Sequence, residues 1–158
     1  MRKKRNYKRE RTPDFKYGSV TLNRFINYLM EGGKKSTAEG IMYRAFADIE
    51  EQTKQKPLEV FEKAVLNASP AVEVSSRRIG GANYQVPREV REERKFMLAA
   101  RWIIAAARAG KGKPMAARLA AELIAACRVT GAVSSTNDPE VRADAAQPAG
   151  RSAWMNFT

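Results

Sequence analysis

The run Arg77–Pro87 holds the side chains with the clearest chemistry in this chain. Two adjacent arginines, Arg77 and Arg78, can each bind a phosphate through two parallel hydrogen bonds. Amide and phenol side chains further along can read base edges or ribose hydroxyls and stack on an exposed base: Asn83, Tyr84 and Gln85. These residue types predict RNA binding. Two alternatives stay open: the arginines could lie on a solvated face, and Tyr84 could pack against the rest of the protein.

Gly80 and Gly81 lie in the middle of this run. Glycine permits positive φ angles and a close approach of the backbone to a ligand. The spacing does not match the dinucleotide-binding fingerprint. On both sides of the glycines, apolar residues alternate with polar or small ones, which is typical of strands: Val72, Val74, Tyr84 and Val86. We therefore expect a β-hairpin at about residues 71–87.

The composition argues against catalysis. The chain has no histidine and a single cysteine, Cys127, so zinc sites and nucleophiles activated by histidine are excluded. Carboxylate or lysine chemistry is not excluded by composition, but no catalytic arrangement of residues is recognisable. We expect a protein that is not an enzyme and that holds no metal and no cofactor. A lone cysteine forms no internal disulfide, which is typical of a reducing cytoplasm.

The chain is strongly basic, with 29 Lys and Arg against 17 Asp and Glu and a net charge of +12. Such a surface attracts a polyanion, of which nucleic acid is the first candidate and an anionic membrane the second. Residues 1–16 hold eight basic and two acidic side chains, a net of +6. We expect this basic extension to be flexible until RNA neutralises it; a solvated tail or a localisation signal is the alternative. Its predicted RNA contacts are Arg2, Lys3, Lys4, Arg5, Lys8, Arg9 and Arg11.

Basic residues also gather in three places further along the chain. Lys34 and Lys35 follow a double glycine, and Lys111 and Lys113 flank another glycine. Because no acid sits beside these lysines in the sequence, we expect them to contact RNA. A third group is interleaved with acids, so either intrahelical ion pairs or RNA contacts explain it: Arg88, Arg91, Arg94, Lys95 and Arg101.

Five segments with the helical spacing of apolar residues surround the hairpin. They begin near Ser19, Ser36, Pro57, Arg91 and Pro114. Ser36 and Glu39 have the spacing of a capping box, and Pro57 suits the first turn of a helix. In the fourth helix we expect an inward face of Met97, Ala100, Ile104 and Ala107, and in the fifth we expect Cys127 to be a small core residue.

These features divide the chain into a basic RNA-binding extension at 1–16, a helical RNA-binding domain at 17–133 and a C-terminal tail at 134–158. The tail has no clear apolar period, although a weak helix at 140–146 is compatible with its sequence. No stretch approaches the ~18 consecutive apolar residues of a membrane-spanning helix. No apolar segment of a secretory signal follows the charged N-terminus.

Several of these motifs resemble the bacterial-type family of small-subunit ribosomal protein seven. The resemblance covers roughly residues 1–133 and rests above all on residues 73–87. Shorter matches support it: Tyr17-Gly18, Phe25-Ile26-Asn27, Gly33-Lys34-Lys35 and Ala100-Arg101-Trp102-Ile103. The family implies a mainly α fold, a bundle of about six helices with a protruding two-stranded β-hairpin arm and a flexible basic N-terminal tail. Beyond Val133 the sequence departs from the family pattern, in which a further helix follows.

The resemblance implies a structural constituent of the small ribosomal subunit. Such a protein binds the 3′ major domain of small-subunit rRNA, nucleates assembly of the head, and lies near the tRNA exit site and the mRNA exit path. The N-terminal extension and Lys34–Lys35 would lie on rRNA, and the ribbon Arg77–Gln85 would reach toward exit-site tRNA. Neighbouring head and platform proteins would belong to the S-eleven and S-nine families. The location would be cytoplasmic, in the ribosome, or in an organelle with bacterial-type ribosomes.

Two other functions use the same basic surface. A free-standing RNA-binding regulator or RNA chaperone is the main alternative, because composition does not distinguish it from a ribosomal component. A membrane-surface protein ranks last, since it needs a basic amphipathic helix with a large apolar face. The basic residues here lie instead in a terminal extension, in loops and in a hairpin, so we expect no membrane partner.

Overall fold

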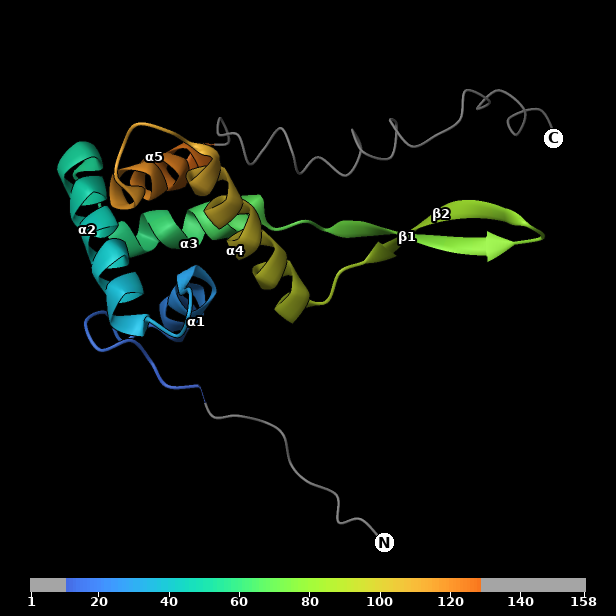
Figure 1. Ribbon diagram of the computed structural model, residues 1–158, viewed down its shortest axis with the longest axis horizontal. Helices are drawn as coiled ribbons and strands as arrows, with labels where there is room; N and C mark the ends of the chain where they lie inside the picture. Colours follow the sequence, from blue (N-terminus) through green and yellow to red (C-terminus); the bar gives the residue numbers. More distant parts are fainter. Residues whose placement is uncertain (1–10, 129–158) are drawn as a thin grey trace, which may run out of the picture.

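The computed structural model describes residues 11–128, which form a helical body with one projecting ribbon (Figure 1). The helices are α1 (Val20–Leu29), α2 (Lys35–Thr53), α3 (Pro57–Ala68), α4 (Glu92–Ala109) and α5 (Met115–Cys127), and the strands are β1 (Val72–Ile79) and β2 (Ala82–Glu89). The predicted mainly α fold with a hairpin arm is therefore confirmed. The described range holds five helices, against the six implied by the resemblance. The sixth would fall in the tail, which lies outside the described residues.

Local sequence explains where two of the helices begin. The side chain of Ser19 caps α1 by accepting a hydrogen bond from the backbone N–H of Leu22. Pro57 occupies the first turn of α3, as predicted. The predicted capping box of Ser36 and Glu39 is wrong. Because the chain turns through the preceding glycines, α2 begins at Lys35 with Lys34 in the cap position, two residues too early for Ser36 to be its cap.

The core lies where α5 packs against α2, α3 and α4. Its largest side chains are three buried phenylalanines, Phe25, Phe46 and Phe61. The Phe25 and Phe61 rings meet edge to face with centroids 5.2 Å apart, and the Phe46 and Phe61 centroids are 6.0 Å apart. Aromatic pairs at such distances add packing energy to the area that they bury. The core therefore holds the ends of all five helices in fixed positions.

The inward face of α4 differs in part from the prediction. Ala100, Ile104 and Ala107 are buried as expected, but Met97 is only partly buried. The packing residues that the periodicity missed are Phe96, Ala99 and Ile103. Alanines occur on most sides of this helix, so its apolar spacing does not define a single face, and the neighbours α1, α3 and α5 decide it. Cys127 is likewise partly buried against the core.

The ribbon is longer than the apolar alternation indicated. β1 and β2 pair in antiparallel register from Val72 opposite Glu89 to Ile79 opposite Ala82. Only Gly80 and Gly81 connect the strands, with φ angles of +57° and +91°. Two consecutive positive φ angles define the two-residue turn that matches the right-handed twist of a hairpin. The polar run of the sequence therefore lies in the strands, which carry it away from the helical body (Figure 1).

Within residues 11–128, no helix combines the length and the apolar character needed to cross a bilayer.

Candidate nucleic-acid interface

The two arginines of the ribbon lie on opposite faces. Directly opposed residues of an antiparallel pair project to the same face, and neighbours along a strand project to opposite faces. Arg77 is paired with Tyr84, whereas Arg78 is paired with Asn83. Both arginines are exposed. The ribbon can therefore bind phosphates on two sides, and the pair does not act on a single surface.

The face of Arg77 is the more apolar one. Tyr84 is 54% exposed and Ile79 is 59% exposed, and both lie on this face. The alternative that Tyr84 packs against the helical body is therefore wrong. Ile79 was not predicted as a site residue. Its position directly before the hairpin turn was a signal that it would be exposed, because such a residue lies far from any core. The opposite face holds Asn83 and Gln85, whose amides can donate and accept hydrogen bonds.

Replacing the two ribbon arginines separately tests this arrangement. We expect Arg77→Ala and Arg78→Ala each to weaken RNA binding. Each should also reduce the slope of log K against log salt by about 1, the effect of one lost phosphate contact. The two losses should add in the double variant, because the side chains lie on opposite faces. Circular dichroism should show an unchanged helical body. Loss of helical signal would contradict the separation of ribbon and body.

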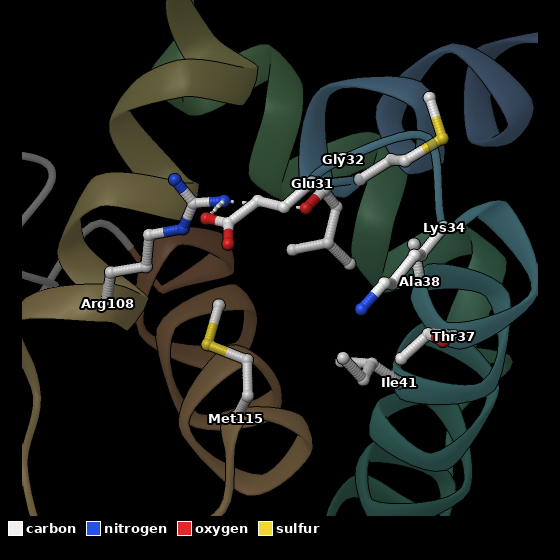
Figure 2. A pocket seen from close by; sticks show the side chains of 10 residues that line it. Glu31, Gly32, Lys34, Thr37, Ala38, Ile41, Arg108 and Met115 are labelled. Atoms are coloured by element: carbon white, nitrogen blue, oxygen red, sulfur yellow. Dashed lines mark hydrogen bonds and ion pairs between the residues drawn. The ribbon is translucent and has the colours of Figure 1, made fainter.

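Two basic loops that are far apart in the sequence meet at one end of the helical body. Lys34 caps α2, and Lys111 and Lys113 lie in the loop between α4 and α5; all three are exposed. The segments before and after these lysines line one open cavity, with Lys34 on one side and Arg108 and Met115 on the other (Figure 2). Of the four lysines that the sequence predicted to contact RNA in these loops, Lys34 lines the cavity, and Lys111 and Lys113 lie in the loop between two other lining residues, Arg108 and Met115.

Side-chain contacts hold these loops in place. The guanidinium of Arg108 in α4 forms an ion pair with Glu31, at 2.7 Å between nitrogen and oxygen, and donates to the backbone oxygen of Leu29 at 3.4 Å. Arg118 of α5 donates to the backbone oxygens of Arg108 and Gly110. Two arginines therefore fix the loops around the cavity.

One lysine of this region has an acidic neighbour after all. The ammonium of Lys35 lies 3.6 Å from the carboxylate of Glu39, one helical turn further along α2. The prediction considered only acids next to Lys35 in the sequence, and it missed Glu39 because residues four apart are neighbours on a helix. An exposed pair of this kind contributes little stability and leaves the lysine able to exchange partners.

Two members of the third basic group, Arg94 and Lys95, form ion pairs, and a further pair joins α4 to Arg11. Lys95 pairs with Glu92 within α4 at 2.9 Å, as the intrahelical interpretation predicted. Arg94 instead pairs at 2.6 Å with Glu73, at the base of the ribbon, and Glu93 pairs with Arg11 at 3.3 Å. This part of α4 therefore anchors the ribbon and the residues that lead into the N-terminal extension.

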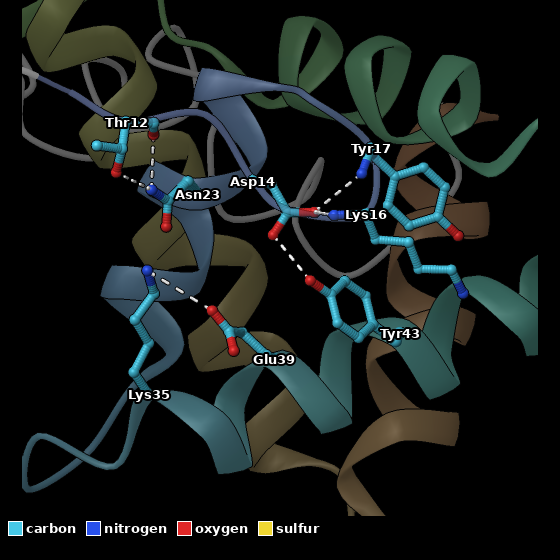
Figure 3. Close-up of polar contacts among 8 residues, drawn as sticks. All are labelled: Thr12, Asp14, Lys16, Tyr17, Asn23, Lys35, Glu39 and Tyr43. Atoms are coloured by element: carbon cyan, nitrogen blue, oxygen red, sulfur yellow. Dashed lines mark hydrogen bonds and ion pairs between the residues drawn. The ribbon is translucent and has the colours of Figure 1, made fainter.

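The end of the basic extension is anchored on α1 and α2 (Figure 3). Asp14 is buried, and its carboxylate accepts the backbone N–H groups of Lys16 and Tyr17 and the hydroxyl of Tyr43 at 2.9 Å. Asn23 of α1 donates to the backbone oxygen of Thr12 at 2.7 Å. The remaining predicted contacts of the extension lie outside the described residues: Arg2, Lys3, Lys4, Arg5, Lys8 and Arg9. Charged and polar contacts thus fix residues 12–17 against α1 and α2.

The hydroxyl of Tyr43 gives this anchor a pH dependence. Burial of the phenol is the largest cause, and the hydrogen bond to Asp14 the second, of a shift that raises the pKa of Tyr43 to about 12. A tyrosine in the unfolded chain ionises near pH 10. Because the folded pKa is the higher one, the stability contributed by Tyr43 is complete below about pH 10 and is lost as the pH rises through about 12.

We therefore expect the free energy of unfolding to fall more steeply over this alkaline range in the wild type than in Tyr43→Phe. Urea unfolding followed by circular dichroism at several pH values measures the difference. Other tyrosines titrate in both proteins, so the difference between the two curves isolates Tyr43. Parallel curves would show that the hydroxyl of Tyr43 does not couple to folding.

Among residues 11–128, no group of three or more His, Cys, Asp or Glu side chains could hold a metal ion. The described features are a helical body, two exposed basic loops and a projecting ribbon with arginines on both faces. They define a class of protein: a small, basic, helical nucleic-acid-binding protein with a β-ribbon arm.

Comparison with known proteins identifies the family. The family model described as ribosomal protein S7p/S5e matches residues 1–146, and the chain belongs to this family, whose members are structural ribosomal components and not enzymes. The match extends past residue 133, where the resemblance was expected to end. Three curated relatives carry the name small ribosomal subunit protein uS7. That of Kosmotoga olearia is 48% identical over 155 residues, covering 98% of this chain and 100% of the relative.

The other two relatives come from Xanthobacter autotrophicus and Chloroflexus aggregans. The protein of Xanthobacter autotrophicus is 51% identical over 148 residues, covering 93% of this chain and 95% of the relative. That of Chloroflexus aggregans is 55% identical over 119 residues, covering 75% of this chain and 76% of the relative. The predicted family is thus confirmed over nearly the whole chain.

Proposed function

We propose that this protein is a structural component of the small ribosomal subunit and that it binds the rRNA of that subunit. The observation that carries the proposal is a cavity lined by Lys34 and by the residues on either side of the loop that holds Lys111 and Lys113, in a member of a ribosomal protein family. Lysines at fixed spacing neutralise phosphates that lie close together in folded RNA. The helical core keeps this spacing constant, because Arg108 and Arg118 hold the loops in place.

The finer assignments are part of the same proposal. The basic loops and the residues of the N-terminal extension bind the 3′ major domain of the rRNA, and binding there nucleates assembly of the subunit head. The ribbon from Arg77 to Gln85 reaches toward exit-site tRNA and the mRNA path, with proteins of the S-eleven and S-nine families as neighbours. The ribbon supports this role because its exposed side chains contact nothing in the described body beyond its base. The proposed location is the ribosome.

Co-sedimentation separates this function from that of a free-standing RNA regulator or chaperone. Cell extract is resolved on a sucrose gradient at low and high magnesium, and the protein is quantified in each fraction by mass spectrometry. A ribosomal component is expected in near-stoichiometric amount in small subunits at both conditions. A protein found mainly in the ribosome-free fractions would overturn the proposal and favour the regulator.

A further inference from the structure

The cavity between the two basic loops has the size and the lining of a small-ligand site. Its volume is about 370 Å³, within the range of sites that hold small organic ligands. Its apolar lining comes from five side chains: Leu29, Met30, Ala38, Ile41 and Met115. Loop and helix contacts hold the walls, since the Arg108–Glu31 ion pair lies at the rim (Figure 2). Two of the lining residues, Leu29 and Ala38, are buried in the core, so this part of the lining belongs to the fixed helical body.

The rim of the cavity is cationic. Lys34 lines it, and Lys111 and Lys113 belong to the loop that connects its two far-side residues, Arg108 and Met115. Glu31 is the acid among the lining residues, and Arg108 neutralises it. An occupant with an anionic group is therefore favoured over a basic or neutral one.

We propose that the cavity receives one unpaired base of the bound RNA, with the phosphate of that nucleotide against Lys34. This inference rests on the proposed function, because it assumes that RNA lies over the basic loops. It adds a specific site to that function: the protein holds a base that has left its helix, in addition to binding the backbone. Lys111 and Lys113 then bind the phosphates on either side of the inserted nucleotide.

The lining favours a base over an amino-acid side chain of another protein. Thioether groups make favourable contacts with aromatic rings and adapt to their shape, and Met30 and Met115 supply two of them. Glu31 contacts Arg108 through Oε1. Its Oε2 can accept a hydrogen bond from a ring or amino N–H on the edge of a base. Sequence-specific RNA recognition commonly holds an unpaired base by contact with its face and by hydrogen bonds to its edge. In this cavity the thioethers take the first role and Oε2 of Glu31 the second.

The first test uses the full chain with ¹³C-labelled methionine methyl groups and the probe adenosine monophosphate. Ring currents from the adenine should shift the methyl resonances of Met30 and Met115, while methionines elsewhere should not move. Ribose 5-phosphate, which has the phosphate but no base, is the matched control and should leave both resonances in place. Equal shifts with the two probes, or none with adenosine monophosphate at millimolar concentration, would overturn the proposal.

The second test compares two neighbouring variants of α2. Thr37 lines the cavity, whereas Ser36 is exposed beside it and does not. Thr37→Glu places a carboxylate where the nucleotide enters, and Ser36→Glu makes the same change of net charge outside. We expect the methionine shifts to disappear in Thr37→Glu and to persist in Ser36→Glu. Binding to a 3′ major-domain rRNA fragment should fall at least about tenfold more in Thr37→Glu than in Ser36→Glu, a difference of about 1.4 kcal/mol in binding free energy.

The outcomes for the two proposals are distinct. If Thr37→Glu and Ser36→Glu bind the fragment equally well, base insertion is wrong while rRNA binding stands. If the wild type does not bind the fragment, the proposed function fails, and the adenosine monophosphate titration still decides whether the cavity takes a base. Should Thr37→Glu not fold, the comparison of adenosine monophosphate with ribose 5-phosphate on the wild type decides the matter.

Discussion

Binding of this protein to rRNA is expected to weaken by roughly 10³–10⁵-fold when the monovalent salt concentration rises from about 50 to about 200 mM. This is the loss for a protein that makes about 6–10 phosphate contacts on duplex DNA, and folded RNA has the same sign of effect. Lys34, Lys111, Lys113, Arg77 and Arg78 are exposed candidates for such contacts, and the extension adds more basic residues. Fluorescence anisotropy with a 3′ major-domain fragment gives the slope of log K against log salt.

A pair of matched variants locates the contributing surface. Lys111→Gln/Lys113→Gln should reduce the slope by about 2, one unit for each lost phosphate contact. Lys54→Gln/Lys56→Gln is the control, because these exposed lysines have the same spacing but lie at the other end of α2. The control should leave the slope nearly unchanged. Equal effects of the two pairs would mean that net charge, and not the convergence of the loops, governs binding.

Phe46→Ala is expected to lower the free energy of unfolding by about 3–5 kcal/mol, the usual cost of truncating a buried aromatic residue. Phe46 is fully buried, with ring centroids 5.1 Å from Tyr17 and 6.0 Å from Phe61. Its removal leaves a cavity beneath the segment that leads from Asp14 into α1. Urea unfolding monitored by circular dichroism measures the change.

The same residue type at an exposed position provides the control for this variant. Phe15 is fully exposed, at 103% of its reference area, so Phe15→Ala should change the free energy of unfolding by less than about 0.5 kcal/mol. If Phe15 contacts the bound rRNA, Phe15→Ala should change the RNA affinity and not the stability. A decrease in the free energy of unfolding of less than about 1 kcal/mol for Phe46→Ala would show that the aromatic cluster contributes little to the stability of the core.

Local patterns predicted the elements well where one residue decides the backbone. Ser19 caps α1, Pro57 begins α3, and Gly80 with Gly81 forms the turn of the ribbon, as their side chains or φ angles require. The prediction failed where two local signals compete. At the start of α2 the glycine turn overrode the capping box of Ser36, a failure that follows from judging the box by spacing alone.

The sequence predicted the residue types of the candidate site but not how these residues are placed relative to one another. Residue type indicated that Arg77, Lys34 and Lys111 would bind a polyanion, and none of them is buried. Their mutual placement depends on contacts between residues far apart in sequence, such as Arg108 with Glu31. The spacing of residues along the chain does not give the distance between Arg108 and Glu31 in the folded protein. The cavity between the loops could therefore not be predicted from the sequence.

The ribbon is attached to the body by few contacts, and this has a consequence for how the protein changes over time. Its base is held by the hydrogen bond from Val90 to Ala71 and by the Arg94–Glu73 ion pair, while its outer residues are exposed. A substitution near Gly80 therefore costs the core nothing. The exposed strand residues of the ribbon can change without repacking Phe25, Phe46 and Phe61, whereas Gly80 and Gly81 stay constrained by the positive φ angles of the turn.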